Sequence, residues 1–119
     1  MVFYTYFITF NFTNSLLMRI KIKATNLELT PAIKEYVENK MTMLDKYLGG
    51  LGPVLCEFEV DLTTHHHLKG KIFRAEANLS FPGQMLRVEK TEKDLYKAID
   101  KVKDHLAPMI KKHKETKLK

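Results

Sequence analysis

Two stretches in the middle of the chain decide the fold: residues 56–62 read CEFEVDL and residues 73–79 read FRAEANL. In both, apolar and polar side chains alternate strictly, which is typical of a β-strand with one face buried and the other in water. After these two stretches, the turn sequence FPGQ at 81–84 leads into a short alternating segment that carries Leu86 and Val88. The sequence therefore predicts three successive antiparallel strands in a sheet that is covered on one side only.

A further strand and a helix precede this meander. Residues 19–25 alternate in the same way, and Thr30-Pro31 provides a helix N-cap followed by proline at the first helical position. Apolar residues then recur every three or four positions until the glycines at 49 and 50, as in an amphipathic helix: Ile33, Val37, Met41, Leu44 and Leu48. A right-handed crossover of this strand–helix–strand unit makes its two strands parallel if they are adjacent.

The last quarter of the chain predicts a second long helix. Its apolar stripe consists of Leu95, Ile99, Val102, Leu106, Met109 and Ile110. Pro108 lies within this segment and has no backbone N–H, so we expect a kink or a fresh turn that aims the basic end of the chain away from the sheet. The predicted fold class is α+β with the order βαβββα, a four-stranded mixed sheet with two helices packed on one face.

The first seventeen residues, MVFYTYFITFNFTNSLL, differ from the rest. They hold six of the twelve aromatic residues and no charge, and they lack the basic start and cleavage site of a secretory signal. We interpret residues 1–17 as a non-native or disordered N-terminal extension, with Met18 as the biological start and residues 18–119 as a single domain. An added edge strand around residues 4–10, or a membrane or targeting role, is the alternative.

Composition and motifs argue against an enzyme. The 119 residues suit one domain, the single cysteine favours a reducing compartment, and no apolar run reaches the ~18 residues of a spanning helix. No phosphate-binding glycine loop or nucleophile elbow is present. Cys56 falls on the inward face of a predicted strand, so we expect it to pack in the core and not to act as a reactive thiol. His65, His66 and His67 cannot all reach one ion without strain, so we predict a polar hairpin tip and neither metal nor cofactor.

Positive charge is concentrated near the C-terminus. The net charge is +6, and residues 90–119 contain ten lysines and five acidic residues. Lys93, Lys97 and Lys101 follow one another at helical spacing, and Lys90 extends the row. Such like-charge neighbours disfavour an isolated helix, whereas a phosphate backbone favours them. A second cluster follows, with Lys111, Lys112, Lys114, Lys117 and Lys119. We predict phosphate contacts with structured RNA without base readout; a solvated, solubilising surface is the alternative.

The water-facing side of the sheet carries charges of both signs. Glu57, Glu59 and Asp61 alternate along one strand, and Arg74 and Arg87 lie on others. Cross-strand ion pairs account for these residues without an acid–base role. The same face supports a further hypothesis, a protein-interaction module.

Four motifs resemble the short ribosome hibernation-promoting factors, relatives of the ribosome-associated inhibitor of translation. They are MRIKI at 18–22, ELTPAI at 28–33, LDKY at 44–47 and DLYKAID at 94–100. The last is the most specific, because it is similar to the family signature D-[ML]-Y-x-A-I-[DN]. The resemblance covers residues 18–119, which supports Met18 as the start.

This resemblance implies the βαβββα fold and cytoplasmic binding to the small ribosomal subunit and its 16S rRNA, between head and body. There the protein would overlap the messenger and transfer RNA sites and inhibit translation under stress or in stationary phase, with a second hibernation factor needed to pair ribosomes. The family's basic positions match Lys34, Lys40, Lys112 and Lys114. Three positions depart from its basic pattern: Met43, His105 and Pro108. A general double-stranded RNA binder is the alternative of similar architecture.

Overall fold

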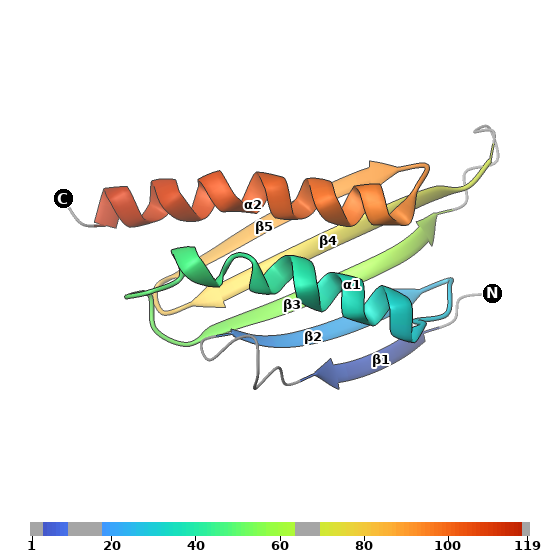
Figure 1. The fold of residues 1–119 in the computed structure, drawn as a ribbon, viewed down its shortest axis with the longest axis horizontal. Helices are drawn as coiled ribbons and strands as arrows, with labels where there is room; N and C mark the ends of the chain where they lie inside the picture. Colours follow the sequence, from blue (N-terminus) through green and yellow to red (C-terminus); the bar gives the residue numbers. More distant parts are fainter. Residues whose placement is uncertain (1–3, 10–17, 64–69, 118–119) are drawn as a thin grey trace.

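The computed structural model describes residues 4–9, 18–63 and 70–117. Five strands form one sheet, and they lie side by side in their order along the chain (Figure 1). Their bounds are β1 Tyr4–Thr9, β2 Met18–Thr25, β3 Val54–Thr63, β4 Ile72–Phe81 and β5 Gln84–Glu92. Strands β2 and β3 are parallel, whereas β3, β4 and β5 form an antiparallel meander. The four predicted strands and their directions are confirmed.

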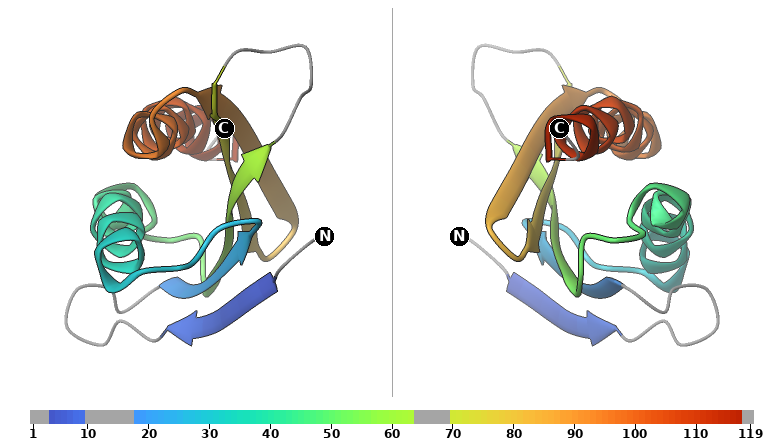
Figure 2. Two further views of the ribbon diagram at one scale, coloured as in Figure 1. Left: turned by 90° about the vertical axis from the view of Figure 1, so that its right-hand side faces the viewer. Right: turned by 90° about the vertical axis from the view of Figure 1, so that its left-hand side faces the viewer.

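Both helices, α1 (Pro31–Thr42) and α2 (Leu95–Lys117), cover the same face of the sheet, as the end-on views in Figure 2 show. The core lies between this helical layer and the sheet. Its largest fully buried side chains include Ile20, Ile22, Phe58, Val60 and Leu79 from the strands and Val37, Met41, Ile99, Leu106 and Ile110 from the helices. The prediction of a sheet covered on one side only is confirmed.

The N-terminal segment adds a fifth strand to the predicted four. Strand β1 pairs antiparallel with β2, from Tyr4 opposite Thr25 to Thr9 opposite Ile20. Residues 4–9 thus form the edge strand that the sequence analysis named as an alternative. Their aromatic and β-branched composition favours this pairing, and the outer edge of β2 offers unpaired backbone groups. The domain boundary at Met18 stays a prediction.

The first helix begins as predicted but ends earlier. The Thr30 hydroxyl accepts a hydrogen bond from the Ile33 backbone N–H at 3.2 Å and caps α1. Regular α-helix stops at Thr42, and a 3₁₀ turn, η1 (Asp45–Tyr47), follows. Leu44 and Leu48 are nevertheless fully buried. The apolar stripe was thus predicted correctly, although its last part lies outside the α-helix.

The expected interruption at Pro108 is wrong, because α2 continues from Leu95 to Lys117 with the proline inside it. A proline at this position leaves the carbonyl of Asp104 without its helical donor. Both residues are exposed, so water can supply the missing hydrogen bond. Beyond the proline, Ile110 is fully buried and the His113 ring lies 5.0 Å from the Phe81 ring of β4. The basic end of the helix therefore stays packed on the sheet.

Candidate nucleic-acid interface

On the open face of the sheet, a network of ion pairs holds the charges. Arg74 projects from β4 and reaches four carboxylates on three strands. The distances are 2.7 Å to Glu59, 3.4 Å to Asp61, 3.2 Å to Glu89 and 3.7 Å to Glu76. Arg87 on β5 pairs with Glu76 as well. The predicted cross-strand pairing is confirmed, and these charges largely satisfy one another.

This network also shifts the pKa of Glu59 and that of Arg74. Burial alone would raise the pKa of Glu59, but hydrogen bonds from Thr25 and Arg74 and the charges of Arg74 and Lys23 lower it below the usual 4.5. Burial alone would lower the pKa of Arg74. Its hydrogen bond to Glu59 and the negative charges of the neighbouring carboxylates outweigh this effect and raise the pKa. Both side chains are therefore charged at neutral pH. A structural cluster of ion pairs requires side chains that stay charged. An acid–base pair would instead require a side chain that gains and loses a proton near neutral pH.

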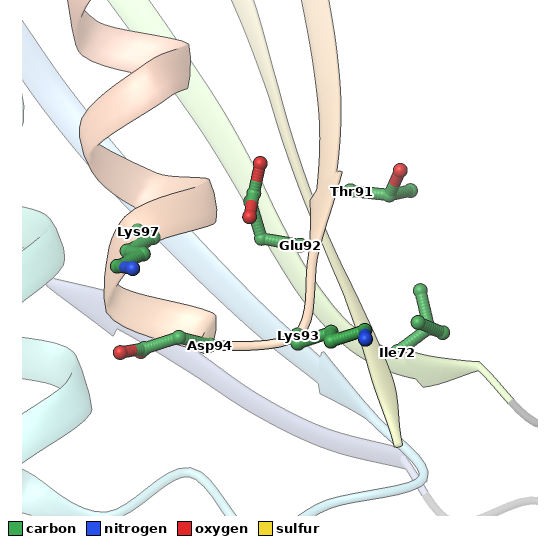
Figure 3. Close-up of a pocket in the computed structure, with 6 residues that line it drawn as sticks. All are labelled: Ile72, Thr91, Glu92, Lys93, Asp94 and Lys97. Atoms are coloured by element: carbon green, nitrogen blue, oxygen red, sulfur yellow. The ribbon is translucent and has the colours of Figure 1, made fainter. Parts of the chain in front are cut away.

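The seam between β5 and α2 gathers four of the predicted lysines. One hollow of about 330 Å³ is lined by Lys93 and Lys97, together with Ile72, Thr91, Glu92 and Asp94 (Figure 3). A second hollow of about 540 Å³ is lined by Lys90 and Lys101. In Figure 3, Lys97 projects from α2, whereas Lys93 extends from the preceding turn toward Ile72. The four lysines border the seam from three different elements.

The predicted single helical row is therefore wrong in its first half. Lys90 belongs to β5, and Lys93 precedes the helix, which starts at Leu95. Asp94 explains this start, because its side-chain oxygen accepts a hydrogen bond from the Tyr96 backbone N–H at 2.8 Å, as an N-cap does. Lys101 forms an ion pair with Glu92 across the seam.

A second basic group lies where α1 faces α2. Lys40 of α1 forms an ion pair with Asp100 of α2, with Nζ 3.2 Å from Oδ1. The Tyr36 hydroxyl donates a hydrogen bond of 2.6 Å to the same oxygen. This hydrogen bond, together with burial and nearby negative charge, raises the pKa of Tyr36 to about 12. The Tyr36 ring meets the Tyr96 ring edge-on, with centroids 4.7 Å apart and planes at 84°.

The C-terminal lysines continue this group along α2. The Lys111 ammonium lies 5.1 Å from the centre of the Tyr47 ring, and that of Lys46 lies 5.2 Å from the same centre. Cations at such distances are attracted to the ring face. Lys112 is exposed and Lys114 is half-buried. Lys119 lies outside the described residues.

Lys34 does not join this group. It lies six residues before Lys40, which places the two about 120° apart around the helix. Lys40 faces α2, so Lys34 points to another flank of α1. The structure thus brings eight of the nine predicted lysines to α2, to its junction with α1 or to its seam with β5.

Sequence reasoning missed the tyrosines of this surface. Aromatic pairs that stack on single-stranded bases are expected on strand faces, whereas Tyr36, Tyr47 and Tyr96 come from α1, η1 and α2. The available signal was the tyrosine inside the DLYKAID motif, at a position that the apolar stripe of the helix does not need.

Metal binding and thiol chemistry find no support in the described ranges 4–9, 18–63 and 70–117. They contain no cluster of ligand side chains able to hold a metal ion. Burial raises the pKa of the Cys56 thiol to about 12, so a reactive thiolate is disfavoured. His65, His66 and His67 lie outside the described residues. Within the same ranges, neither helix has the length and apolar character needed to cross a membrane.

Comparison with known proteins assigns the family. The family model described as Sigma 54 modulation protein / S30EA ribosomal protein matches residues 20–118. The chain belongs to this family. The ribosome hibernation promoting factor of Escherichia coli is 31% identical over 98 residues, which cover 82% of this chain and 95% of that protein. The ribosome hibernation promotion factor of Deinococcus radiodurans is 29% identical over 99 residues, 83% of this chain and 50% of that protein.

The S30EA chain therefore spans about half the length of some relatives, including that from Lactococcus lactis, and nearly all of the Escherichia coli one. Its fold is similar to the crystal structure of the N-terminal domain of Thermus thermophilus Protein Y, with 36% identity and a TM-score of 0.66. That match covers 85% of this chain and 99% of the other. A ribosomal subunit interface protein from Coxiella burnetii, at 17% identity and a TM-score of 0.62, has the same fold. The family resemblance drawn from the motifs is confirmed.

Proposed function

We propose that this S30EA protein is a ribosome hibernation factor that performs no catalysis. It binds the small ribosomal subunit in the cytoplasm, contacts 16S rRNA near the messenger and transfer RNA sites, and inhibits translation under stress or in stationary phase. The names of its relatives support the class of activity. The observation that carries the proposal is the division of charge between the two sides of the sheet.

On the open face, acidic and basic side chains pair with each other, as described around Arg74. Lys93, which extends toward Ile72 from the turn before α2, makes no ion pair within the described part of the chain. Neither do five predicted lysines on the helix side: Lys90, Lys97, Lys111, Lys112 and Lys114. Their ammonium groups remain available for an external polyanion. Phosphate contacts of this kind supply most of the affinity for nucleic acid without reading its sequence.

This division also separates the alternatives. A protein-interaction module on the open face would have to break ion pairs that already stabilise the fold, so the charge pattern disfavours it. A general double-stranded RNA binder would use the same lysines, and only competition on the ribosome separates it from a hibernation factor.

The test is cosedimentation of the full chain with purified small subunits, in competition with transfer RNA. We expect the chain to pellet with the subunits and to compete with transfer RNA. Lys97→Glu combined with Lys101→Glu should weaken pelleting while the circular dichroism spectrum stays unchanged. Lys97→Gln and Lys21→Gln provide a matched pair, because each removes one charge but Lys21 lies on the open face.

Three outcomes would contradict the proposal. If the protein with Lys97→Glu and Lys101→Glu bound small subunits as tightly as the unsubstituted chain, the seam would be excluded from the binding site. Binding to any RNA duplex without displacement of transfer RNA would favour the general RNA binder. Binding that survives nuclease treatment and high salt would favour the protein module, because phosphate contacts weaken steeply as salt rises.

A further inference from the structure

The junction of α1 and α2 contains an exposed ring that phosphate binding does not require. Tyr96 is 37% exposed, and within residues 18–63 and 70–116 only Met43 and Met85 are comparable exposed large apolar residues. The Tyr36 ring stands at 84° to the Tyr96 ring. A perpendicular neighbour covers at most one face of a ring, so Tyr36 leaves at least one face of Tyr96 uncovered.

The residues around this ring are held in place from both helices. Asp100 Oδ1 accepts the hydrogen bond from the Tyr36 hydroxyl at 2.6 Å and lies 3.2 Å from the Lys40 ammonium. That ammonium also lies 5.3 Å from the centre of the Tyr36 ring. Because Lys40 opposes the charge of Asp100, the site does not present an uncompensated anion to RNA. A platform that is already fixed loses little conformational freedom when a ligand stacks on it.

Two features of the site point to a nucleotide as the ligand. An open aromatic face can stack on any base, and such stacking requires a base that is not paired within a duplex. Lys97, the next residue of α2, makes no ion pair within the described part of the chain, and its ammonium suits the phosphate of the same nucleotide. A contact that only joined the two helices would need no exposed ring face.

We propose that Tyr96 stacks on an unpaired base of the bound RNA, with Tyr36 and Asp100 as positioning residues. This inference rests on the proposed function and extends it, since the sequence alone predicted phosphate contacts without base readout. It assigns the ligand class as a single-stranded nucleotide within structured RNA.

The test uses the full chain and a short single-stranded RNA that contains a fluorescent adenine analogue, whose emission falls on stacking. We expect quenching with the unsubstituted chain and with Tyr96→Phe, which keeps the ring. Tyr96→Leu should abolish the quenching and weaken binding about tenfold, the factor that corresponds to a stacking free energy of ~1.4 kcal/mol. Met85→Leu is the matched control, because it alters an exposed apolar side chain at the opposite end of β5 and should change neither quantity.

The positioning role has its own readout. Tyr36→Phe keeps the ring but removes the hydrogen bond to Asp100, so the depth of quenching should fall while the salt dependence of binding stays the same. A purely structural role would leave the quenching at saturation unchanged. Melting temperatures of all variants confirm that each is folded.

The stacking proposal and the proposed function fail in different ways. Absence of quenching with the unsubstituted chain, or equal quenching with Tyr96→Leu, would overturn the stacking proposal even if the chain pellets with small subunits. Failure to pellet would refute the hibernation function, whatever the oligonucleotide shows.

Discussion

Replacing Arg74 with methionine tests whether the open face is a self-satisfied structural surface. Methionine keeps the apolar stem of the side chain but removes the guanidinium that joins four carboxylates. The side chains of Arg74, Glu59, Asp61 and Glu76 are 18%, 20%, 16% and 11% exposed, so their charges are closer to the buried than to the exposed case.

The expected cost follows from these exposures. Removing one partner of a fully buried ion pair costs about 3–5 kcal/mol, whereas an exposed pair contributes about 0–1 kcal/mol. Lys23 still pairs with Glu59, and Arg87 still pairs with Glu76, in the variant. We therefore expect Arg74→Met to lower the free energy of unfolding by about 2–3 kcal/mol at pH 7. Arg87→Met is the control: its side chain is 64% exposed, and its loss should cost under about 1 kcal/mol.

The pH dependence provides a second check with a defined sign. Because the network lowers the pKa of Glu59 below its usual 4.5, the stability from its charged form is present above pH 4.5 and is lost as pH falls through the folded-state pKa. Arg74→Met removes two of the causes that lower this pKa, a hydrogen bond and a positive charge, whereas Thr25 and Lys23 remain. The difference in stability between variant and parent should therefore shrink below pH 4.5.

Urea unfolding followed by circular dichroism at several pH values measures both quantities, since the chain has no tryptophan to report by fluorescence. Equal costs for Arg74→Met and Arg87→Met would refute the reasoning. So would a cost for Arg74→Met that is the same at pH 3.5 as at pH 7.

Three further predictions concern the helices. Pro108→Ala restores a backbone donor in a continuous helix and should raise the free energy of unfolding by about 1 kcal/mol or more, measured by urea titration; an unchanged or lower value would contradict the described helix. Tyr36→Phe should cost about 1 kcal/mol at pH 7. Since the pKa of Tyr36 is raised to about 12 by its hydrogen bond to Asp100, the stability it contributes is present below pH 10 and is lost between pH 10 and 12, so the variant should lack this alkaline loss. Lys97→Ala should reduce the slope of log affinity for the small subunit against log salt by about 0.7–0.9. Lys101→Ala should reduce this slope less, because the Lys101 ammonium already has a carboxylate partner. Equal slopes for the two variants would contradict the prediction.

The sequence by itself determined the element order from Met18 onward, the one-sided sheet and the family. Alternation along CEFEVDL and FRAEANL is a local signal with a period of two, and it predicts directly which side chains are buried. The apolar stripe that ends at Leu48 is equally local, although Leu44 and Leu48 lie on either side of a 3₁₀ turn and outside the α-helix. The DLYKAID motif is contiguous, so it identifies the family without any knowledge of the fold.

Only the tertiary structure decided how the functional side chains are grouped. Lys40 and Asp100 are sixty residues apart, and they meet because α1 and α2 pack side by side on the same face of the sheet. The same packing brings Tyr36 to Tyr96, and the β5–α2 turn separates lysines that a helical wheel had placed in one row. Periodicity reports which face of an element is buried, but contacts between elements depend on the distances and angles at which those elements pack. For that reason the sequence predicted a basic surface, and the structure divided it into a seam and an aromatic junction.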